Sequence, residues 1–248
     1  MDNDDAPVGH VLTRRKALAL MGASGVILLK GCSLTEMFNS NTTGDATACV
    51  VRPQQTEGPY FVDEKLNRSD IRTDPTDGAV KPGVPLQLTF NVSRIAANAC
   101  TPLEGVLVDI WHCDALGVYS DVQDPGFNSV GKKFLRGYQV TDSSGVARFT
   151  TIYPGWYRGR TVHIHFKIRS APSASPGFEF TSQLYFDDAL TDQVHAQEPY
   201  AAKGPRTLRN AGDGIFAQAG SQLILALTPL APNGQGYAAT FNIALQST

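Results

Sequence analysis

Short runs of alternating apolar and polar residues, separated by turn-forming residues, recur along this chain from about residue 86 onward. The clearest run has Leu86, Leu88, Phe90 and Val92 at every second position. A β-strand turns successive side chains to opposite faces, so this pattern predicts half-buried strands. No long amphipathic helix interrupts the series, and helices do not alternate with strands as they do in parallel α/β folds. The pattern favours an all-β sandwich or barrel of antiparallel strands.

Seven further segments have the character of strands. They are residues 106–111, 138–141, 147–151, 163–168, 183–186, 223–227 and 239–243. The sequence Asp-Ser-Ser-Gly at 142–145 separates two of them and predicts a β-hairpin. Weaker patterns at 188–196 and 201–206 predict short helical turns. We therefore expect an all-β protein with an antiparallel β-sandwich core, long loops and few short helical turns.

The N-terminal part reads as a targeting segment rather than as part of the fold. Residues 13–16 are Thr-Arg-Arg-Lys, directly before an apolar run over 17–29. A twin arginine in this place predicts a Tat-type export signal over residues 1–32, and a chance arginine pair before an ordinary Sec signal is the alternative. The run ends in Leu-Lys-Gly-Cys, which resembles a lipobox and makes Cys32 a candidate lipid anchor. Residues 33–48 are polar and predict a flexible linker.

The four cysteines fit an exported protein, because disulfides persist outside the cytoplasm. Cys49 and Cys100 lie at the edges of expected elements in polar surroundings, and they are our preferred disulfide pair. Cys113 lies beside a buried strand and is expected to be a free, packed thiol.

The overall composition is that of an ordinary globular protein, with 42% hydrophobic and 18% charged residues and a net charge of -2. This charge gives no electrostatic basis for binding nucleic acid. No second core is evident, so residues 49–248 are expected to form one folded domain. No feature of the sequence specifies an oligomeric state.

Two histidines, His163 and His165, lie two residues apart in the sequence Thr-Val-His-Ile-His-Phe at 161–166. On a strand both would project to one face, while the apolar residues around them would point into the core. Tyrosine and arginine lie just upstream. Imidazoles beside phenols indicate a metal site with hard anionic oxygen ligands, which favours ferric iron.

The His-x-His pair alone leaves other functions open. One alternative is a zinc or Fe(II) enzyme that uses His163 and His165 with a carboxylate such as Asp114. Another is a non-catalytic β-sandwich module of the cell envelope that binds aromatic or carbohydrate ligands.

Five segments, in this order, resemble the intradiol ring-cleavage dioxygenases, the family of protocatechuate 3,4-dioxygenase and catechol 1,2-dioxygenase. They are residues 55–61 (QTEGPYF), 103–111 (LEGVLVDIW), 114–119 (DALGVY), 152–165 and 182–186 (SQLYF). The resemblance runs from about residue 54 to 186 and is closest to the exported, single-domain branch.

The resemblance implies a non-haem Fe(III) held by two tyrosinates and two histidines. Matched by motif, these ligands are Tyr119, Tyr157, His163 and His165. Free tyrosine has a pKa of about 10, so phenolate ligands at neutral pH need a strong Lewis acid beside them. The residue types therefore agree with the implied metal.

Two further residues are implied to act at this centre. Arg160, three residues before His163, would stabilise negative charge as the family's active-site arginine does, and Gln183 would line the pocket. Tyr153 competes with Tyr157 for the place of the second phenolate, and the alignment on Pro-Gly at 154–155 favours Tyr157.

Two other histidines have expected places outside the ligand set. His112 would share a face with core residues of its strand and is expected to be a hydrogen-bonded core or supporting histidine. His195 lies in a polar segment and is expected to be solvated.

With the leader, the resemblance implies an exported enzyme, periplasmic or extracellular, that uses O2 to cleave a catechol-type aromatic to a muconic-type diacid. Its expected catalytic residues are Tyr157, Arg160 and Gln183. Only five residues separate Tyr157 from His163, and this loop is considerably longer in the catechol and protocatechuate enzymes. We therefore expect a more open metal centre here.

Overall fold

The computed structural model describes residues 49–96, 99–174, 177–230 and 236–246. The expected export signal, the candidate lipidation site at Cys32 and the linker lie outside these residues. Within the described part of the chain, no helix is long and apolar enough to cross a membrane.

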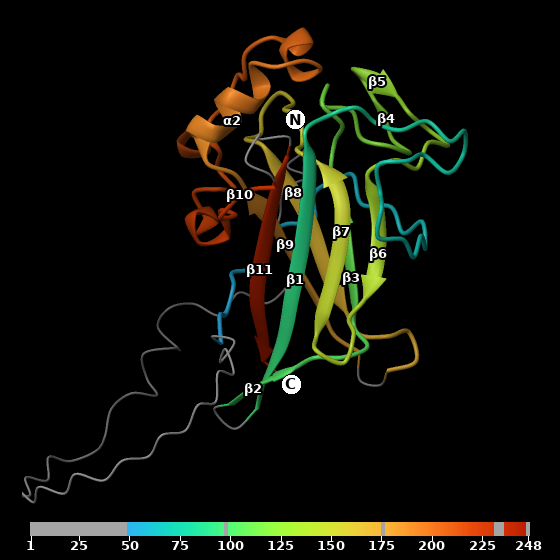
Figure 1. The fold of residues 1–248 in the computed structure, drawn as a ribbon, viewed down its shortest axis with the longest axis vertical. Helices are drawn as coiled ribbons and strands as arrows, with labels where there is room; N and C mark the ends of the chain where they lie inside the picture. The colour runs from blue at the N-terminus through green and yellow to red at the C-terminus, as the bar shows by residue number, and fades with distance from the viewer. Residues whose placement is uncertain (1–48, 97–98, 175–176, 231–235, 247–248) are drawn as a thin grey trace, which may run out of the picture. The chain divides into compact units, whose positions relative to one another are not determined.

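Two main β-sheets form the domain, and a small third sheet lies at one end (Figure 1). The strands are β1 (Pro85–Ala96), β2 (Ala99–Pro102), β3 (Leu107–Trp111), β4 (Gln123–Asp124), β5 (Phe127–Asn128), β6 (Arg136–Val140), β7 (Val146–Ile152), β8 (His163–Arg169), β9 (Glu179–Tyr185), β10 (Thr228–Pro229) and β11 (Tyr237–Gln246). The β1 sheet has the order β10-β11-β1-β2, with β7 also paired to β1, and the β8 sheet has the order β6-β3-β8-β9. The predicted antiparallel sandwich is confirmed, except that β1 and β11 pair in parallel.

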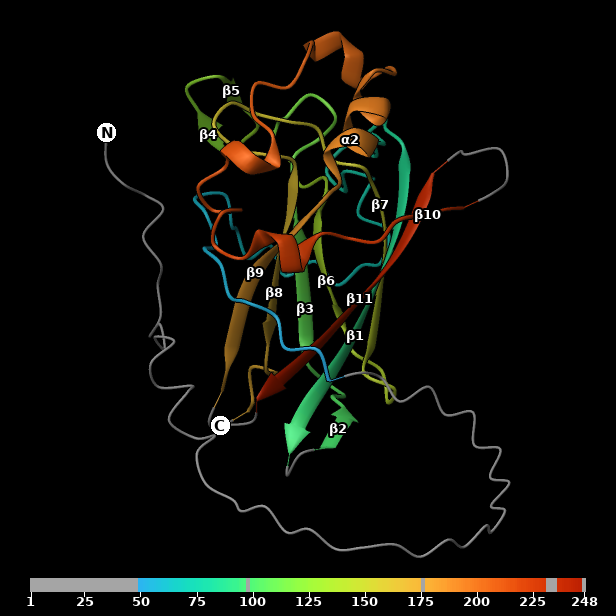
Figure 2. The ribbon, with the colours of Figure 1, turned by 90° about the vertical axis from the view of Figure 1, so that its left-hand side faces the viewer.

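In the part of the chain that the structure describes, the helical elements all follow β9. They are α2 (Asp188–His195) and the short 3-10 helices η2 (Tyr200–Lys203), η3 (Asn210–Gly212) and η4 (Gly220–Leu223). Asp187 begins α2, because its side chain accepts a hydrogen bond from the backbone N–H of Leu190. Both predicted helical turns are therefore confirmed. Figures 1 and 2 show α2 at the same end of the sandwich as β4 and β5.

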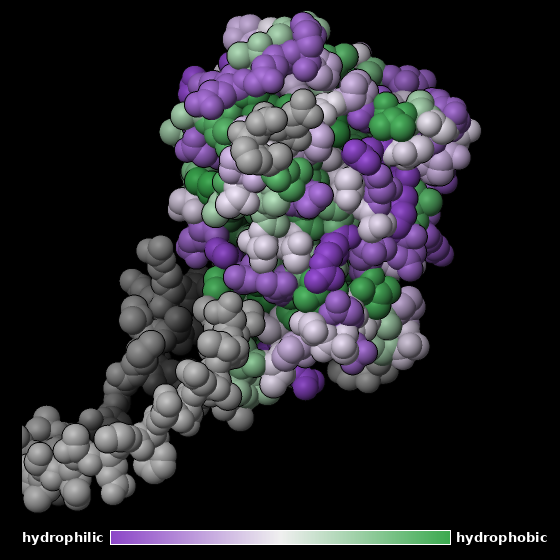
Figure 3. Space-filling view, in the orientation of Figure 1, coloured by the Kyte–Doolittle hydropathy of each residue, from purple (hydrophilic) through white to green (hydrophobic). Residues whose placement is uncertain are grey.

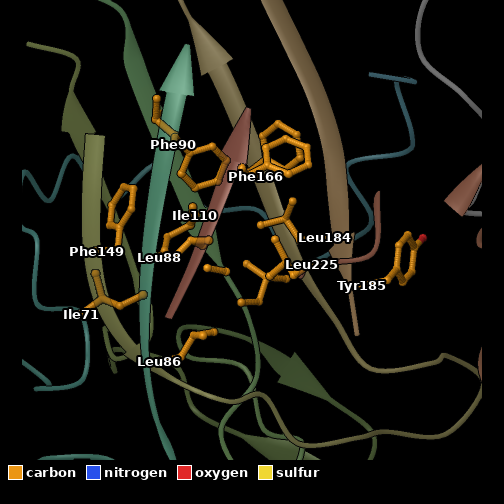
Figure 4. Packing of buried hydrophobic residues seen from close by; sticks show 14 of the residues in the cluster. Ile71, Leu86, Leu88, Phe90, Ile110, Phe149, Phe166, Leu184, Tyr185 and Leu225 are labelled. Atoms are coloured by element: carbon orange, nitrogen blue, oxygen red, sulfur yellow. The ribbon is translucent and has the colours of Figure 1, made fainter. Parts of the chain in front are cut away.

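The core lies between the inner faces of the two sheets (Figure 4). Alternate residues of β1 point inward, as predicted, and the Phe90 ring lies 5.4 Å from the Phe166 ring of β8 and 5.7 Å from the Phe241 ring of β11. Each fully buried side chain of this kind contributes about 1.5–3 kcal/mol to stability. Figure 3 shows that apolar residues form only small, separate patches on the outer face over β1 and β7. The apolar residues of these strands are therefore mostly turned inward.

The predicted hairpin at 142–145 is wrong. The tight turn is present, because Gly145 N–H donates to the carbonyl oxygen of Asp142 at 2.8 Å. However, β6 pairs with β3 in the β8 sheet, whereas β7 pairs with β1 in the other sheet. The turn therefore carries the chain from one layer of the sandwich to the other. Gly145 has a left-handed φ of +73°, and a Cβ there would lie 2.2 Å from the Val92 carbonyl oxygen, so the turn packs tightly on β1.

One predicted strand, at 223–227, is also wrong. Leu223 ends the 3-10 helix η4, and Ile224 makes only an isolated bridge with Tyr185. Leu223 and Leu225 are buried, so the apolar alternation here reflects packing of a loop against the core. The other predicted strands are confirmed.

Three of the cysteines, Cys49, Cys100 and Cys113, have the predicted states. Cys49 and Cys100 form a disulfide, and they are exposed and half-buried, respectively. Cys113 is a free thiol that is 1% exposed, and burial raises the pKa of this thiol. The disulfide joins the start of the described chain to β2.

The face of the β8 sheet that points away from the core carries a row of buried side chains. Strand register aligns four residues in one row across β6, β3, β8 and β9. They are Arg136, Trp111, His165 and Gln183, and each is at most 3% exposed. Residues directly opposite on neighbouring strands share a face and lie in contact range. This row is therefore the floor of a site on the outside of the sandwich.

Residues 53–61, here called the covering segment, lie over this outer face. At the edge of β9 the Gln55 N–H donates to the Thr181 carbonyl oxygen at 3.1 Å, and on the outer face Gln183 Nε2 donates to the Thr56 carbonyl oxygen at 2.9 Å. Figure 2 shows the segment, near the blue end of the colour scale, running past β8 and β9. It buries the polar row and forms one wall above it.

Candidate metal centre

His163 and His165 lie side by side at the start of β8, on one face as the alternation predicts. Both are at most 2% exposed, and their Nε2 atoms lie 2.9 Å apart. The Nδ1 atom of His163 lies 2.7 Å from the Thr161 carbonyl oxygen, which can only accept a hydrogen bond. The proton of neutral His163 is therefore on Nδ1, and its Nε2 lone pair points toward His165.

The two predicted tyrosines reach the same point from two different loops. The hydroxyl oxygens of Tyr119 and Tyr157 lie 3.5 Å and 3.3 Å from His163 Nε2. Tyr119 follows β3, whereas Tyr157 lies between β7 and β8. Gly117 allows the loops to touch, because it has a φ of +79° and a Cβ there would lie 2.2 Å from the Trp156 carbonyl oxygen.

Four polar atoms thus converge on one centre: two imidazole nitrogens and two phenol oxygens. Donor atoms that bind one ion at about 2 Å lie about 3 Å from each other, which is the spacing seen here. Phenolate and imidazole together suit ferric iron. The residues present therefore fit the metal that the sequence predicts.

Burial sets the charge state of these groups in the absence of a cation. It lowers the pKa of His163 and of His165, and the nearby Arg160 guanidinium lowers both further. Burial raises the pKa of Tyr119 and of Tyr157. Without a cation, all four groups are neutral at pH 7. Ionising two buried phenols needs a strong positive charge at the centre, such as a trivalent ion supplies.

Arg160 is held firmly beside the centre. Its Nε donates to Asp213 at 2.9 Å, one terminal nitrogen donates to Gln183 Oε1 at 2.6 Å, and the other lies 3.5 Å from His163 Nε2. Burial lowers the pKa of Arg160, but the nearby Tyr157 and Asp213 together raise it by more. The net shift of the pKa is upward, so the guanidinium is charged. Both Arg160 and Gln183 therefore lie where the sequence predicts.

Asp213 is the main residue of this site that the sequence did not indicate. It is 1% exposed and accepts four N–H groups: those of Arg160 Nε, Thr161, Ile215 and Phe216. It lies in the loop after η3, 50 residues beyond His163 in the chain, and no local pattern marks it.

Aromatic rings line the rest of the centre. The Tyr60 ring lies 4.6 Å from that of Tyr119, and its hydroxyl donates to Asp124 at 2.7 Å. The Trp111 ring stacks on His165, with centroids 5.1 Å apart and planes within 7°. Tyr60 and Trp111 lie in segments that carry the family resemblance, but the sequence did not identify either residue as part of the centre.

The competing candidates lie elsewhere. Tyr153 is buried in the core, where its hydroxyl bonds Thr191 Oγ1 at 2.7 Å, so Tyr157 is the tyrosine at the centre. The carboxylate of Asp114 pairs with Lys81 at 2.9 Å and accepts two backbone N–H groups. Among the described residues, no group of three or more His, Cys, Asp and Glu side chains could hold a metal.

The two remaining histidines differ in how well they were predicted. His112 is a hydrogen-bonded core residue, as expected, with Nε2 2.7 Å from Thr151 Oγ1. The expectation that His195 is solvated is wrong: it is 8% exposed, stacks on Tyr200, and its Nε2 lies 3.0 Å from the Pro154 carbonyl oxygen. Its polar neighbours in the sequence point outward from α2, whereas His195 packs inward.

Comparison with known proteins gives consistent matches. The family model described as "Dioxygenase" matches residues 56–247. Chlorocatechol 1,2-dioxygenase of Pseudomonas putida is 32% identical over 176 residues, covering 62% of either chain. The protocatechuate 3,4-dioxygenase beta chain of Burkholderia cepacia is 31% identical, covering 61% of this chain and 65% of its own. This chain thus spans less than two thirds of the length of these curated relatives.

Among solved structures, an intradiol ring-cleavage dioxygenase from Tetranychus urticae matches with a TM-score of 0.69 and 31% identity. The match covers 80% of this chain and 95% of that one. The dioxygenase domain of a dioxygenase carbohydrate-binding protein fusion from Streptomyces sp. SirexAA-E matches with a TM-score of 0.54 and 30% identity. That match covers 80% of this chain and 100% of the other.

Proposed function

This chain belongs to the intradiol ring-cleavage dioxygenase family, and on that premise we propose that it is an iron(III) enzyme that uses O2 to cleave a catechol-type aromatic to a muconic-type diacid. The observation that carries the proposal is the convergence of Tyr119, Tyr157, His163 and His165 on one buried centre. When bound, ferric iron would chelate the two catechol oxygens and make the ring reactive toward O2.

Tyr157 is the residue best placed to move a proton. Its Oη lies beside the Arg160 guanidinium, which favours the phenolate, whereas burial favours the neutral phenol. With a trivalent ion bound, Tyr157 would be the phenolate and could accept a proton at Oη from an incoming catechol hydroxyl, after which burial would favour the neutral phenol. Tyr119 is more deeply buried, at 1% exposed, and is better suited to remain a fixed ligand.

Arg160 supplies the fixed positive charge of the proposed site. Asp213 and Gln183 hold its guanidinium in place, so no reorganisation is needed when negative charge develops on a bound substrate.

The loop between Tyr157 and His163 is short, with five residues between the two. Arg158 and Gly159 at its tip are exposed, and a Cβ at Gly159 would meet no atom within 4 Å. We infer that the site accepts catechols with bulky ring substituents, because this loop is too short to close over them.

A visible absorption spectrum of the purified, ferric-loaded protein tests the proposal. We expect a broad tyrosinate-to-iron band that shifts when catechol is added without oxygen, followed by uptake of one O2 per catechol once air is admitted. Tyr119→Phe and Tyr157→Phe should each weaken or shift the band. Tyr138→Phe is the matched control, since Tyr138 lies on β6 outside the centre. A protein that stays colourless after ferric loading would refute the proposal and favour a binding module.

We also propose export, with Cys32 as a candidate lipid anchor. The Cys49–Cys100 disulfide supports an oxidising compartment. Fractionation of cells that express the full chain, with and without replacement of Arg14 and Arg15 by Lys, tests the Tat assignment. Retention of the variant in the cytoplasm is expected, and normal export of the variant would contradict it.

A further inference from the structure

The two histidines of the centre are held in different ways. The Nδ1 atom of His163 bonds the Thr161 carbonyl oxygen, which fixes the plane of that ring. The Nδ1 atom of His165 is buried and has no hydrogen-bond partner among the described residues. Metal-binding histidines usually donate this N–H to an acceptor that fixes the ring plane. Something else must therefore orient His165.

Stacking on Trp111 provides that orientation. Trp111 of β3 lies directly opposite His165 of β8 in the antiparallel register, so both side chains leave the same face of the sheet. Their rings are parallel within 7°, with centroids 5.1 Å apart, and both residues are 1% exposed. Turning the His165 ring would give up this stacked contact.

Two neighbours complete the arrangement. The Phe61 ring lies 4.8 Å from that of Trp111, which prevents the indole from moving away. At Gly58, a Cβ would lie 3.1 Å from His165 Cε1, so the covering segment approaches the imidazole closely. The Trp111 indole N–H has no partner among the described residues either, so its contribution comes from the ring and not from a hydrogen bond.

We propose that Trp111 is a positioning residue that sets the ring plane of His165 by stacking, in place of the usual hydrogen bond. The inference rests on the proposed function, because the orientation matters when His165 Nε2 binds iron. It predicts that an aromatic ring at position 111 is needed and that the indole N–H is not.

The test compares Trp111→Phe with Trp111→Leu in the ferric-loaded protein, reading iron affinity and the visible and EPR spectra. Loss of a group that orients a ligand lowers metal affinity about 10- to 100-fold, and we expect this for Trp111→Leu together with a changed EPR signal. Trp111→Phe should keep the iron affinity within about threefold of wild type and leave the EPR signal unchanged. Phe90→Leu, an aromatic loss in the core away from the centre, controls for general destabilisation and should leave the spectra of the folded protein unchanged.

Unchanged affinity and spectra in Trp111→Leu, or an equal change in Phe90→Leu, would overturn the inference. A crystal structure of metal-free Trp111→Leu gives a readout that needs no iron: a rotated His165 ring supports the inference, and an unmoved ring contradicts it. If Trp111→Leu does not fold, Trp111→Met replaces it, since methionine is flexible enough to fill the space. A colourless wild-type protein would instead count against the proposed function, so the two failures are distinct.

Discussion

Replacing Asp213 with asparagine is expected to destabilise the protein strongly, because its buried carboxylate accepts four N–H groups. In the wild type, one carboxylate oxygen accepts from Arg160 Nε at 2.9 Å and from the Thr161 N–H at 2.7 Å. The other accepts from the N–H groups of Ile215 and Phe216. Asparagine can keep one oxygen for two of these donors, but its amide nitrogen would face the other two.

The magnitude follows from the bonds that are lost. Two charge-assisted hydrogen bonds are worth about 1.5–3 kcal/mol each. Breaking a buried ion pair costs about 3–5 kcal/mol, and Arg160 would be left largely buried without its partner. We therefore expect the free energy of unfolding to fall by about 4 kcal/mol. With a urea m-value of about 2 kcal/mol per molar, the midpoint would move down by about 2 M.

Urea unfolding followed by tryptophan fluorescence measures this change, and oxygen uptake with catechol measures the effect on Arg160. A double-mutant cycle with Arg160→Gln should give a coupling of about 2 kcal/mol or more. Arg148→Ala serves as control, because it removes an exposed ion pair with Asp142 and should cost under about 1 kcal/mol. A loss below about 1 kcal/mol in Asp213→Asn, or no coupling to Arg160, would refute the reasoning.

Three further outcomes are expected. Burial lowers the pKa of His112 to about 4, against about 6.5 in the unfolded chain, so between these pH values only the unfolded state binds the proton. The free energy of unfolding should therefore be highest above pH about 6.5 and fall by up to about 3 kcal/mol by pH 4. In His112→Gln, the urea midpoints measured across this pH range should vary less than in the wild type. Replacing Cys49 and Cys100 with serine should cost about 4 kcal/mol, because the disulfide closes a loop with a sequence separation of 51, and equal melting temperatures with and without reductant would contradict this. Gly117→Ala should destabilise more than Gly78→Ala, which shares the left-handed φ but meets no atom within 4 Å and should cost about 1 kcal/mol; equal thermal shifts would be the contrary result.

The sequence predicted those features that depend on local periodicity. Alternation along β1 and β8 was sufficient to find the strands and to put His163 and His165 on one face. The tyrosines came only from the family resemblance, because no local pattern separates Tyr157 from Tyr153. The structure separates them through packing: Tyr153 bonds Thr191 in the core, while Tyr157 reaches His163.

The failures arise where tertiary contacts decide the outcome. The turn at 142–145 has the same residue chemistry whether its strands pair with each other or enter different sheets, and only the partners of β6 and β7 distinguish the two. The polar surroundings of His195 hid a side chain that packs on Tyr200. Asp213 had no local signal, because its role depends on a loop that meets Arg160 only in the folded chain.

Because the centre lies on the outer face of the β8 sheet, its donor side chains and the core side chains occupy opposite faces of the same strands. Along β8, Ile164 and Phe166 hold the sandwich together, while His163 and His165, on the other side of the same strand, carry the donor atoms. Substitutions that repack the interior need not disturb the donors, and exchanges in the covering segment need not disturb the interior. Core substitutions selected for thermal stability and covering-segment substitutions selected for substrate preference should therefore have nearly additive effects when they are combined in one protein.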